Sequence, residues 1–149
     1  YRAGLVDAVC ELCENMSRRY GTAFRVEGDI EDTINLDDGT ATVLFKAVRE
    51  LLFNVVKHAK ANEAVVCIAR EGSMLNLTVE DHGTGIQQFD AAENDMSPPG
   101  LGLFGVRERL RTLGGKMQII SPPGGGTKVT LSALIRGSKI NSEPPPDNV

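Results

Sequence analysis

Three glycine-containing segments have the composition of loops that bring the backbone close to a ligand. They are DHGTG at residues 81–85, GLGLFG at 100–105 and GGGT at 124–127. Glycine permits positive φ and close approach of the backbone, and a glycine-rich turn into a helix presents N–H groups to an anion. Residues 100–104 therefore predict a phosphate cradle, although each segment taken alone is most simply a turn. GLGLFG follows a loop rather than a strand, and no Gly-Lys-Ser/Thr follows it, which argues against the Rossmann and Walker A motifs.

One predicted helix carries a carboxylate, an amide and an ammonium group on one facet. At about 100° per residue, Glu50, Asn54 and Lys57 lie within about 60° of one another. Taken alone, such a facet is typical of solvated surface. Its combination with Asp81 at a strand end, and with glycines on both sides of a long loop, instead predicts a single nucleotide site.

Hydrophobic periodicity and turn residues predict the elements that position these groups. Helices are expected at residues 3–20, from a capping segment at 37–40 to about residue 61, and at 103–113. Strands are expected at 22–30, 63–71, 74–80, 116–121 and 127–135, with a short extended piece at 33–36. Apolar and polar residues alternate along the strand at 74–80, which predicts one buried sheet face. The pattern favours an α+β two-layer sandwich with a mixed, mostly antiparallel sheet and helices on one face.

The composition excludes several classes of protein. Lys and Arg number 16 against 20 Asp and Glu, a net charge of −4, which argues against a nucleic-acid-binding surface. No apolar run approaches the ~20 residues that span a bilayer, and no signal peptide is recognisable, so no direct membrane contact is expected. Cys10, Cys13 and Cys67 are too few for a four-ligand zinc site, so the C-x-x-C pair fits a packed helix face. An odd number of cysteines favours a reducing, cytoplasmic compartment.

The order of these segments resembles the GHKL superfamily of ATPases. ELLFNVVKHA at residues 50–59 is similar to its N box, DHGTG to its G1 box, GLGLFGVRERL to its G2 box and GGGT to its closing Gly-Thr element. The KHA sequence and the run from GVRERL to LGG resemble sensor histidine kinases whose response regulators are of the NarL type. The resemblance covers about residues 40–135. It implies the Bergerat fold and the Mg-ATP-binding catalytic domain of a protein-histidine kinase.

The resemblance implies roles for the polar residues of the N box. Asn54 is expected to coordinate Mg²⁺, which prefers oxygen ligands, and Glu50 to support the metal-water shell. These two residues are the catalytic candidates. Lys57 is expected to meet the phosphates as a point charge, with help from His58.

The glycine boxes have their own implied roles. Asp81 is expected to accept a hydrogen bond from the adenine amino group, and Thr127 to lie near the adenine. Gly83 and Gly85 are expected to let the strand end turn beneath the base. His82 departs from the small polar residue more common in this family, and a solvent-facing position is the simplest expectation for it.

The G2 box is the last candidate binding segment. Gly100 and Gly102 are expected to bound a lid and to approach the phosphates, and Leu101 and Leu103 belong to the same segment. The lid itself is expected at about residues 87–99, and to be mobile without nucleotide.

The resemblance also implies how the chain divides and what it works with. Because the sequence starts at Tyr1 and is helix-like almost at once, it is expected to be a piece of a longer protein, and both a soluble and a membrane-anchored parent fit this expectation. Residues 1–21 are expected to lead from an upstream acceptor domain, 22–136 to form the ATP-binding domain and 137–149 to be a disordered tail. The partners expected are a dimerisation domain carrying an acceptor histidine, and a response regulator. His58 and His82 lie within the nucleotide motifs, so neither is a credible acceptor.

Three alternatives share these boxes. An anti-sigma-factor-like kinase would phosphorylate a protein serine. A conformational ATPase of the gyrase, Hsp90 or MutL type would use Glu50 to activate water. A degenerate interaction module would not bind ATP, so Mg-ATP would leave its melting temperature unchanged.

Overall fold

The helices and strands follow one another in the order that the sequence predicts. The computed structural model describes residues 4–28, 36–59, 62–82, 102–121, 123 and 125–135. The elements are α1 (Gly4–Tyr20), β1 (Ala23–Glu27), α2 (Asp38–Asn54), the π-helical turn η1 (Val55–Ala59), β2 (Glu63–Glu71), β3 (Met74–Asp81), α4 (Leu103–Thr112), β4 (Lys116–Ile120) and β5 (Thr127–Leu134). Most of the expected extended piece at 33–36, the lid at 87–99 and the tail at 137–149 lie outside the described residues.

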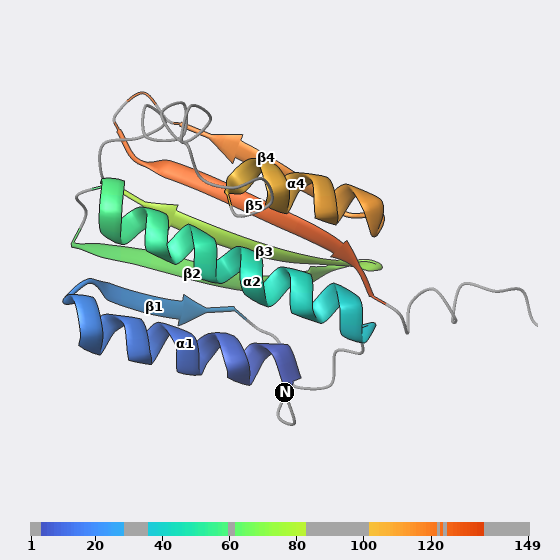
Figure 1. Ribbon diagram of the computed structural model, residues 1–149, viewed down its shortest axis with the longest axis horizontal. Coiled ribbons are helices and arrows are strands. Elements are labelled where there is room, and N and C mark those ends of the chain that lie inside the picture. Colours follow the sequence, from blue (N-terminus) through green and yellow to red (C-terminus); the bar gives the residue numbers. More distant parts are fainter. Residues whose placement is uncertain are drawn as a thin grey trace, which may run out of the picture.

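A single sheet of five strands forms one layer of the domain. Its strand order is β1-β2-β3-β5-β4. The pair β1–β2 is parallel, whereas the pairs β2–β3, β3–β5 and β4–β5 are antiparallel. The helices α1, α2 and α4 cover the same face of this sheet (Figure 1). The predicted α+β two-layer sandwich with a mixed, mostly antiparallel sheet is therefore confirmed.

Local capping chemistry sets the ends of the helices. The Asp37 carboxylate accepts a hydrogen bond from the Thr40 N–H at 3.3 Å and so caps α2. Gly21 ends α1 with a φ of 78°, a conformation that glycine adopts without a steric cost, and its N–H bonds to the Ser17 carbonyl. Both devices stand where the sequence predicts them.

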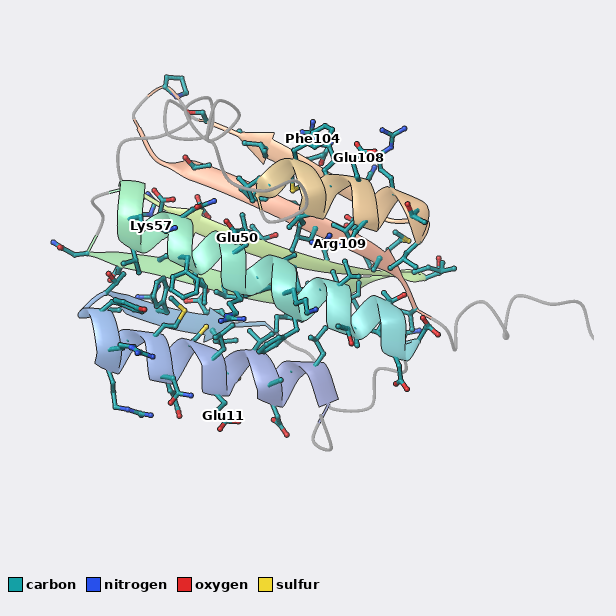
Figure 2. All side chains as sticks on the ribbon, viewed as in Figure 1. Glu11, Glu50, Lys57, Phe104, Glu108 and Arg109 are labelled. Carbon is teal, nitrogen blue, oxygen red and sulfur yellow. The ribbon has the colours of Figure 1, made fainter. Side chains whose placement is uncertain are left out.

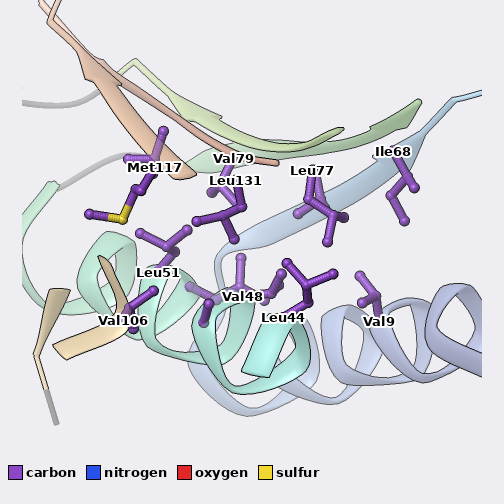
Figure 3. Packing of buried hydrophobic residues seen from close by; sticks show 14 of the residues in the cluster. Val9, Leu44, Val48, Leu51, Ile68, Leu77, Val79, Val106, Met117 and Leu131 are labelled. Carbon is purple, nitrogen blue, oxygen red and sulfur yellow. The ribbon is translucent and has the colours of Figure 1, made fainter. Parts of the chain in front are cut away.

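The hydrophobic core lies between the sheet and the three helices. Figure 3 shows Val9, Leu44 and Val48 on the helical side, opposite side chains from the sheet. The alternation along β3 holds, because Leu75, Leu77 and Val79 are buried and the residues between them are only half-buried. Helix α1 contributes to the same core through Val9, Cys13 and Met16.

The cysteines behave as packing residues. All three are free thiols, and Cys13 is 1% exposed. Burial, together with the neighbouring Cys10, raises the pKa of the Cys13 thiol to about 12. Within the described part of the chain, no group of three or more His, Cys, Asp or Glu residues is arranged to hold a metal ion. None of the described helices is long and apolar enough to cross a membrane.

Candidate functional site

The predicted motifs converge on one edge of the domain. In Figure 1 the C-terminal end of α2, the end of β3 and the start of β5 lie on the same side of the molecule. Helix α4 begins toward this side, so its N-terminus faces the same region (Figure 1). The sheet order β2-β3-β5 thus brings the end of β3 and the start of β5 to the same edge, although these segments are far apart in the sequence.

Asp81 is the most deeply placed polar residue of this edge. It is the last residue of β3 and follows Leu75, Leu77 and Val79 on the buried, helix-covered face of the strand. Only 5% of its surface is exposed. Asp81 therefore places a carboxylate at the rim of the apolar core, at the end of a strand.

Thr127 lies directly beside Asp81 on the neighbouring strand. The two residues are register partners in the antiparallel pair β3–β5. Directly opposed residues in such a pair have Cβ atoms about 4.5–5.5 Å apart. The half-buried Thr127 hydroxyl and the buried carboxylate therefore form one polar pair at the end of the sheet.

Gly126 makes this close arrangement possible. Its φ is +92°, and an added Cβ would lie 2.4 Å from the Asp81 carbonyl oxygen and 3.1 Å from the His82 Cα. The turn before it is tied down by a 3.4 Å hydrogen bond from the Ser121 hydroxyl to the Gly126 carbonyl. A side chain at position 126 would push the β3 end, and Asp81 with it, out of place.

Helix α2, which carries the other candidate groups, packs against α4 and β3. Glu50 and Asn54 are half-buried, one helical turn apart on α2. Figure 2 shows Glu50 on the side of α2 that faces α4, and Arg109 on the side of α4 that faces α2. The carboxylate and amide of the predicted facet are thus at the edge of the core, and an oppositely charged residue faces Glu50.

The third member of the facet, Lys57, is displaced by a change of helix type. The predicted helix to about residue 61 is described to residue 59, and its last five residues form the π-turn η1 instead of continuing as α-helix. At this transition the Val55 N–H bonds to both the Leu51 and Leu52 carbonyls. One turn of a π-helix contains more than four residues, so each residue rotates by less than about 90° around the helix axis, compared with about 100° in an α-helix.

The π-turn rotates Lys57 away from Asn54 and toward Phe53. In a continuous α-helix, Lys57 would be rotated about the helix axis by about 60° from Asn54 and by about 40° from Phe53. In the wider π-turn, the rotation from Asn54 grows to about 90° and that from Phe53 falls to about 10°. The Lys57 Nζ accordingly lies over the Phe53 ring, 6.0 Å from its centroid. The Lys57 side chain is exposed.

The start of α4 presents backbone groups to the same edge. Gly102 is the N-cap of α4 and makes no side-chain capping hydrogen bond. The first N–H groups of an α-helix have no partner within the helix, and the helix dipole favours an anion there. The Leu103 side chain is buried in the core at 6% exposure, so this residue offers its backbone N–H rather than its side chain.

The remaining predicted residues are only partly described. His82 follows β3 and is exposed, which agrees with the solvent-facing position expected for it. His58 lies in η1, where the structure describes its backbone. Gly83, Gly85, Gly100 and Leu101 lie outside the described residues.

Two further residues, Gly126 and Phe53, contact the predicted site residues. Gly126 belongs to the recognised GGGT segment, but only its contact with Asp81 gives it a distinct role. Phe53 packs partly against the core and contacts Lys57 and Arg49. The spacing of Arg49, Phe53 and Lys57 at four-residue intervals was the available signal, since such residues are helical neighbours.

Comparison with known proteins gives matches over most of the chain. A family model described as "Histidine kinase-, DNA gyrase B-, and HSP90-like ATPase" matches residues 39–136. The sensor histidine kinase LiaS of Bacillus subtilis is 30% identical over 132 residues, which make up 89% of this chain and 34% of that protein. The nitrate/nitrite sensor protein NarX of Escherichia coli K12 is 29% identical over 131 residues, 88% of this chain and 21% of NarX. The chain therefore spans about a third or less of these relatives.

A solved structure matches the fold as well. The histidine kinase domain of a blue-light activated histidine kinase from Erythrobacter litoralis EL346 superposes with a TM-score of 0.69 at 25% identity. The match covers 92% of this chain and 68% of that chain. Together these matches confirm the resemblance that the motifs and their order predict.

Proposed function

Because the chain belongs to the family of histidine kinase-, DNA gyrase B- and HSP90-like ATPases, we propose that it binds Mg-ATP and positions it for phosphoryl transfer to a histidine. The observation that carries the proposal is the buried Asp81 at the end of β3, beside Thr127 and beneath Gly126. A buried acceptor fixed at a strand end suits recognition of one specific donor group.

The adenine would be held at this end of the sheet. The Asp81 carboxylate would accept a hydrogen bond from the adenine amino group, and the Thr127 hydroxyl would lie next to the same base edge. A base without an amino group at that position would leave the buried carboxylate without its ligand hydrogen bond. A buried polar group that loses its hydrogen bond costs more free energy than a satisfied hydrogen bond contributes. The Asp81–Thr127 pair would therefore favour adenine over guanine.

The triphosphate would extend from the base toward α2 and α4. The N–H groups at the start of α4 and the Lys57 ammonium would face the phosphate oxygens. The donor set fits Mg²⁺, because Asn54 supplies one side-chain oxygen and Glu50 a nearby carboxylate, while Mg²⁺ commonly keeps several waters and binds phosphates.

Transfer would take place to a histidine outside these 149 residues. An imidazole nitrogen of the acceptor would attack the γ-phosphorus, the bond from phosphorus to the β,γ-bridging oxygen would break, and ADP would leave. Such reactions depend chiefly on positioning and charge stabilisation, which Asn54, Lys57 and the α4 N-terminus would supply. The acceptor domain of the parent protein and a response regulator would be the partners of this domain.

A transfer assay with labelled ATP tests the proposal. The chain is incubated with γ-labelled Mg-ATP, alone and with a separately produced acceptor domain of the parent protein. We expect no self-labelling, labelling of the acceptor, and loss of that labelling in Asn54→Ala. Asn76→Ala is the matched control, since Asn76 is a half-buried amide in mid-β3 whose partners are Glu71 and Ser132.

Other outcomes of this assay contradict the proposal. Strong self-labelling of the 149 residues would contradict an external acceptor. ATP hydrolysis without acceptor labelling, abolished by Glu50→Ala, would instead indicate a conformational ATPase.

A further inference from the structure

Phe53 is the centre of a small aromatic and cationic cluster beside the π-turn. Its ring contacts the Tyr20 ring edge to face, with centroids 5.9 Å apart and planes at 70°. The Arg49 guanidinium carbon lies 5.8 Å from the Phe53 centroid, and the Lys57 Nζ lies 6.0 Å from it. The cluster thus joins the end of α1, the last turns of α2 and η1.

The Phe53 ring is the fixed member of this cluster. It is half-buried and packs against the core, and the edge contact from Tyr20 restricts its tilt. Lys57 is exposed, and a lysine side chain has four rotatable bonds whose freedom must be lost whenever its ammonium is held in one place. A rigid aromatic surface one turn before a flexible cation is therefore able to restrict where that cation lies.

An aromatic partner differs from a carboxylate in one important respect. A cation over a ring is attracted by the ring quadrupole, and its charge is not neutralised. No ion pair to Lys57 is found among the described residues, whose salt bridges involve Arg25 and Arg111. The contact with Phe53 thus orders the ammonium and leaves its full charge available to an anion.

We propose that Phe53 is a positioning residue that, together with the π-turn, holds the Lys57 ammonium ready for the nucleotide triphosphate. This inference rests on the proposed function and deepens it. The π-turn rotates Lys57 over the ring, and the ring then limits the conformations of its side chain. Phe53 itself touches neither nucleotide nor metal in this account, so its substitution should change phosphate recognition and not base recognition.

The first test measures the contact without nucleotide. Lysines are converted to ¹³C-dimethyl-lysine, the Lys57 signal is assigned with Lys57→Arg, and its shift is read by NMR. We expect a ring-current displacement of that signal, lost in Phe53→Leu and kept in Phe45→Leu, a half-buried phenylalanine two turns earlier on α2. A Lys57 signal at the position of freely exposed lysines would overturn the proposal, whatever the nucleotide measurements give.

The second test measures binding by calorimetry, with ATP and adenosine as probes. Phe53→Leu should weaken ATP binding about two- to fivefold, the range expected for loss of an exposed cation–π contact, and leave adenosine binding unchanged. In the Lys57→Met variant, the additional substitution Phe53→Leu should not weaken ATP binding further. Phe53→Tyr should retain wild-type ATP affinity.

The outcomes separate this inference from the function on which it rests. Equal weakening of ATP and adenosine in Phe53→Leu would indicate a general packing role and overturn the positioning role alone. Unchanged ATP affinity in Phe53→Leu would also overturn the positioning role alone. Failure of the wild-type chain to bind either ligand would overturn the proposed function, and the positioning role with it.

Discussion

Gly126→Ala should damage both the stability of the domain and its base-binding end. The glycine has a φ of +92°, so any side chain there pays the left-handed backbone cost of about 1–2 kcal/mol. Its Cβ would also lie 2.4 Å from the Asp81 carbonyl oxygen, where ordinary contacts begin at 3.4 Å. About 1 Å of overlap with a strand backbone must be relieved, and such overpacking typically costs a further ~1–3 kcal/mol.

Gly114→Ala separates these two contributions. Gly114 has a similar φ of +83°, but an added Cβ there meets nothing within 4 Å. Urea denaturation should therefore show a loss of about 1–2 kcal/mol in Gly114→Ala and about 2–5 kcal/mol in Gly126→Ala. Calorimetry with adenosine should show weaker binding in Gly126→Ala only, because only that substitution displaces Asp81.

Equal behaviour of the two glycine variants would contradict this prediction. If Gly126→Ala lost no more free energy of unfolding than Gly114→Ala, the contact between Gly126 and Asp81 would not constrain the β3 end. If adenosine binding survived unchanged in Gly126→Ala, Asp81 would not be the base-binding group.

Two further predictions concern the thiol and the helix cap. The Cys13 pKa is raised to about 12 from its ordinary 9.0, so the unfolded chain ionises this thiol first and the free energy of unfolding should fall as the pH rises above about 9. Cys13→Ala should flatten this decline in pH-dependent denaturation, and at pH 8 a disulfide reagent should modify Cys67 well before Cys13; equal reaction rates would contradict the burial. Asp37→Ala removes the acceptor of the Thr40 N–H and should cost about 1 kcal/mol in urea denaturation. The exposed neighbour Asp38 is the control, and an equal loss in Asp38→Ala would show that the cap contributes nothing specific.

Local patterns in the sequence were sufficient to predict most of the fold. The alternation of Leu75, Leu77 and Val79 predicted the buried face of β3, and Asp81 continues the same period onto that face. Gly21 and Asp37 marked helix ends through chemistry that operates within four residues. These features depend on neighbours in the chain, so one sequence suffices to recognise them.

The pairing of distant segments was beyond such reasoning. The parallel pairing of β1 with β2 and the position of β5 between β3 and β4 depend on which strands meet in space. The direct opposition of Asp81 and Thr127 follows from that pairing, as does the contact of Gly126 with Asp81. The motifs therefore predicted a set of candidate residues, whereas the contacts among those residues depend on the strand pairing.

The π-turn also escaped prediction. Residues 55–59 continue the apolar and polar pattern of the helix before them, so their local sequence favours an α-helix. An extra residue in the turn changes the direction of Lys57 without changing the composition. The four-residue spacing of Phe53 and Lys57 could have indicated their contact, but not the change of helix type beside it.

Mapping of Mg-ATP binding by amide NMR would show, without any substitution, whether this edge of the sheet binds the nucleotide. We expect saturable shifts of the Asp81, Gly126 and Thr127 amides and of Leu103 at the start of α4. The Gly72 amide, in the turn at the opposite end of β3, should stay unchanged. Absence of any shift at millimolar Mg-ATP, or shifts confined to residues away from this edge of the sheet, would contradict the claim that this edge is a nucleotide site.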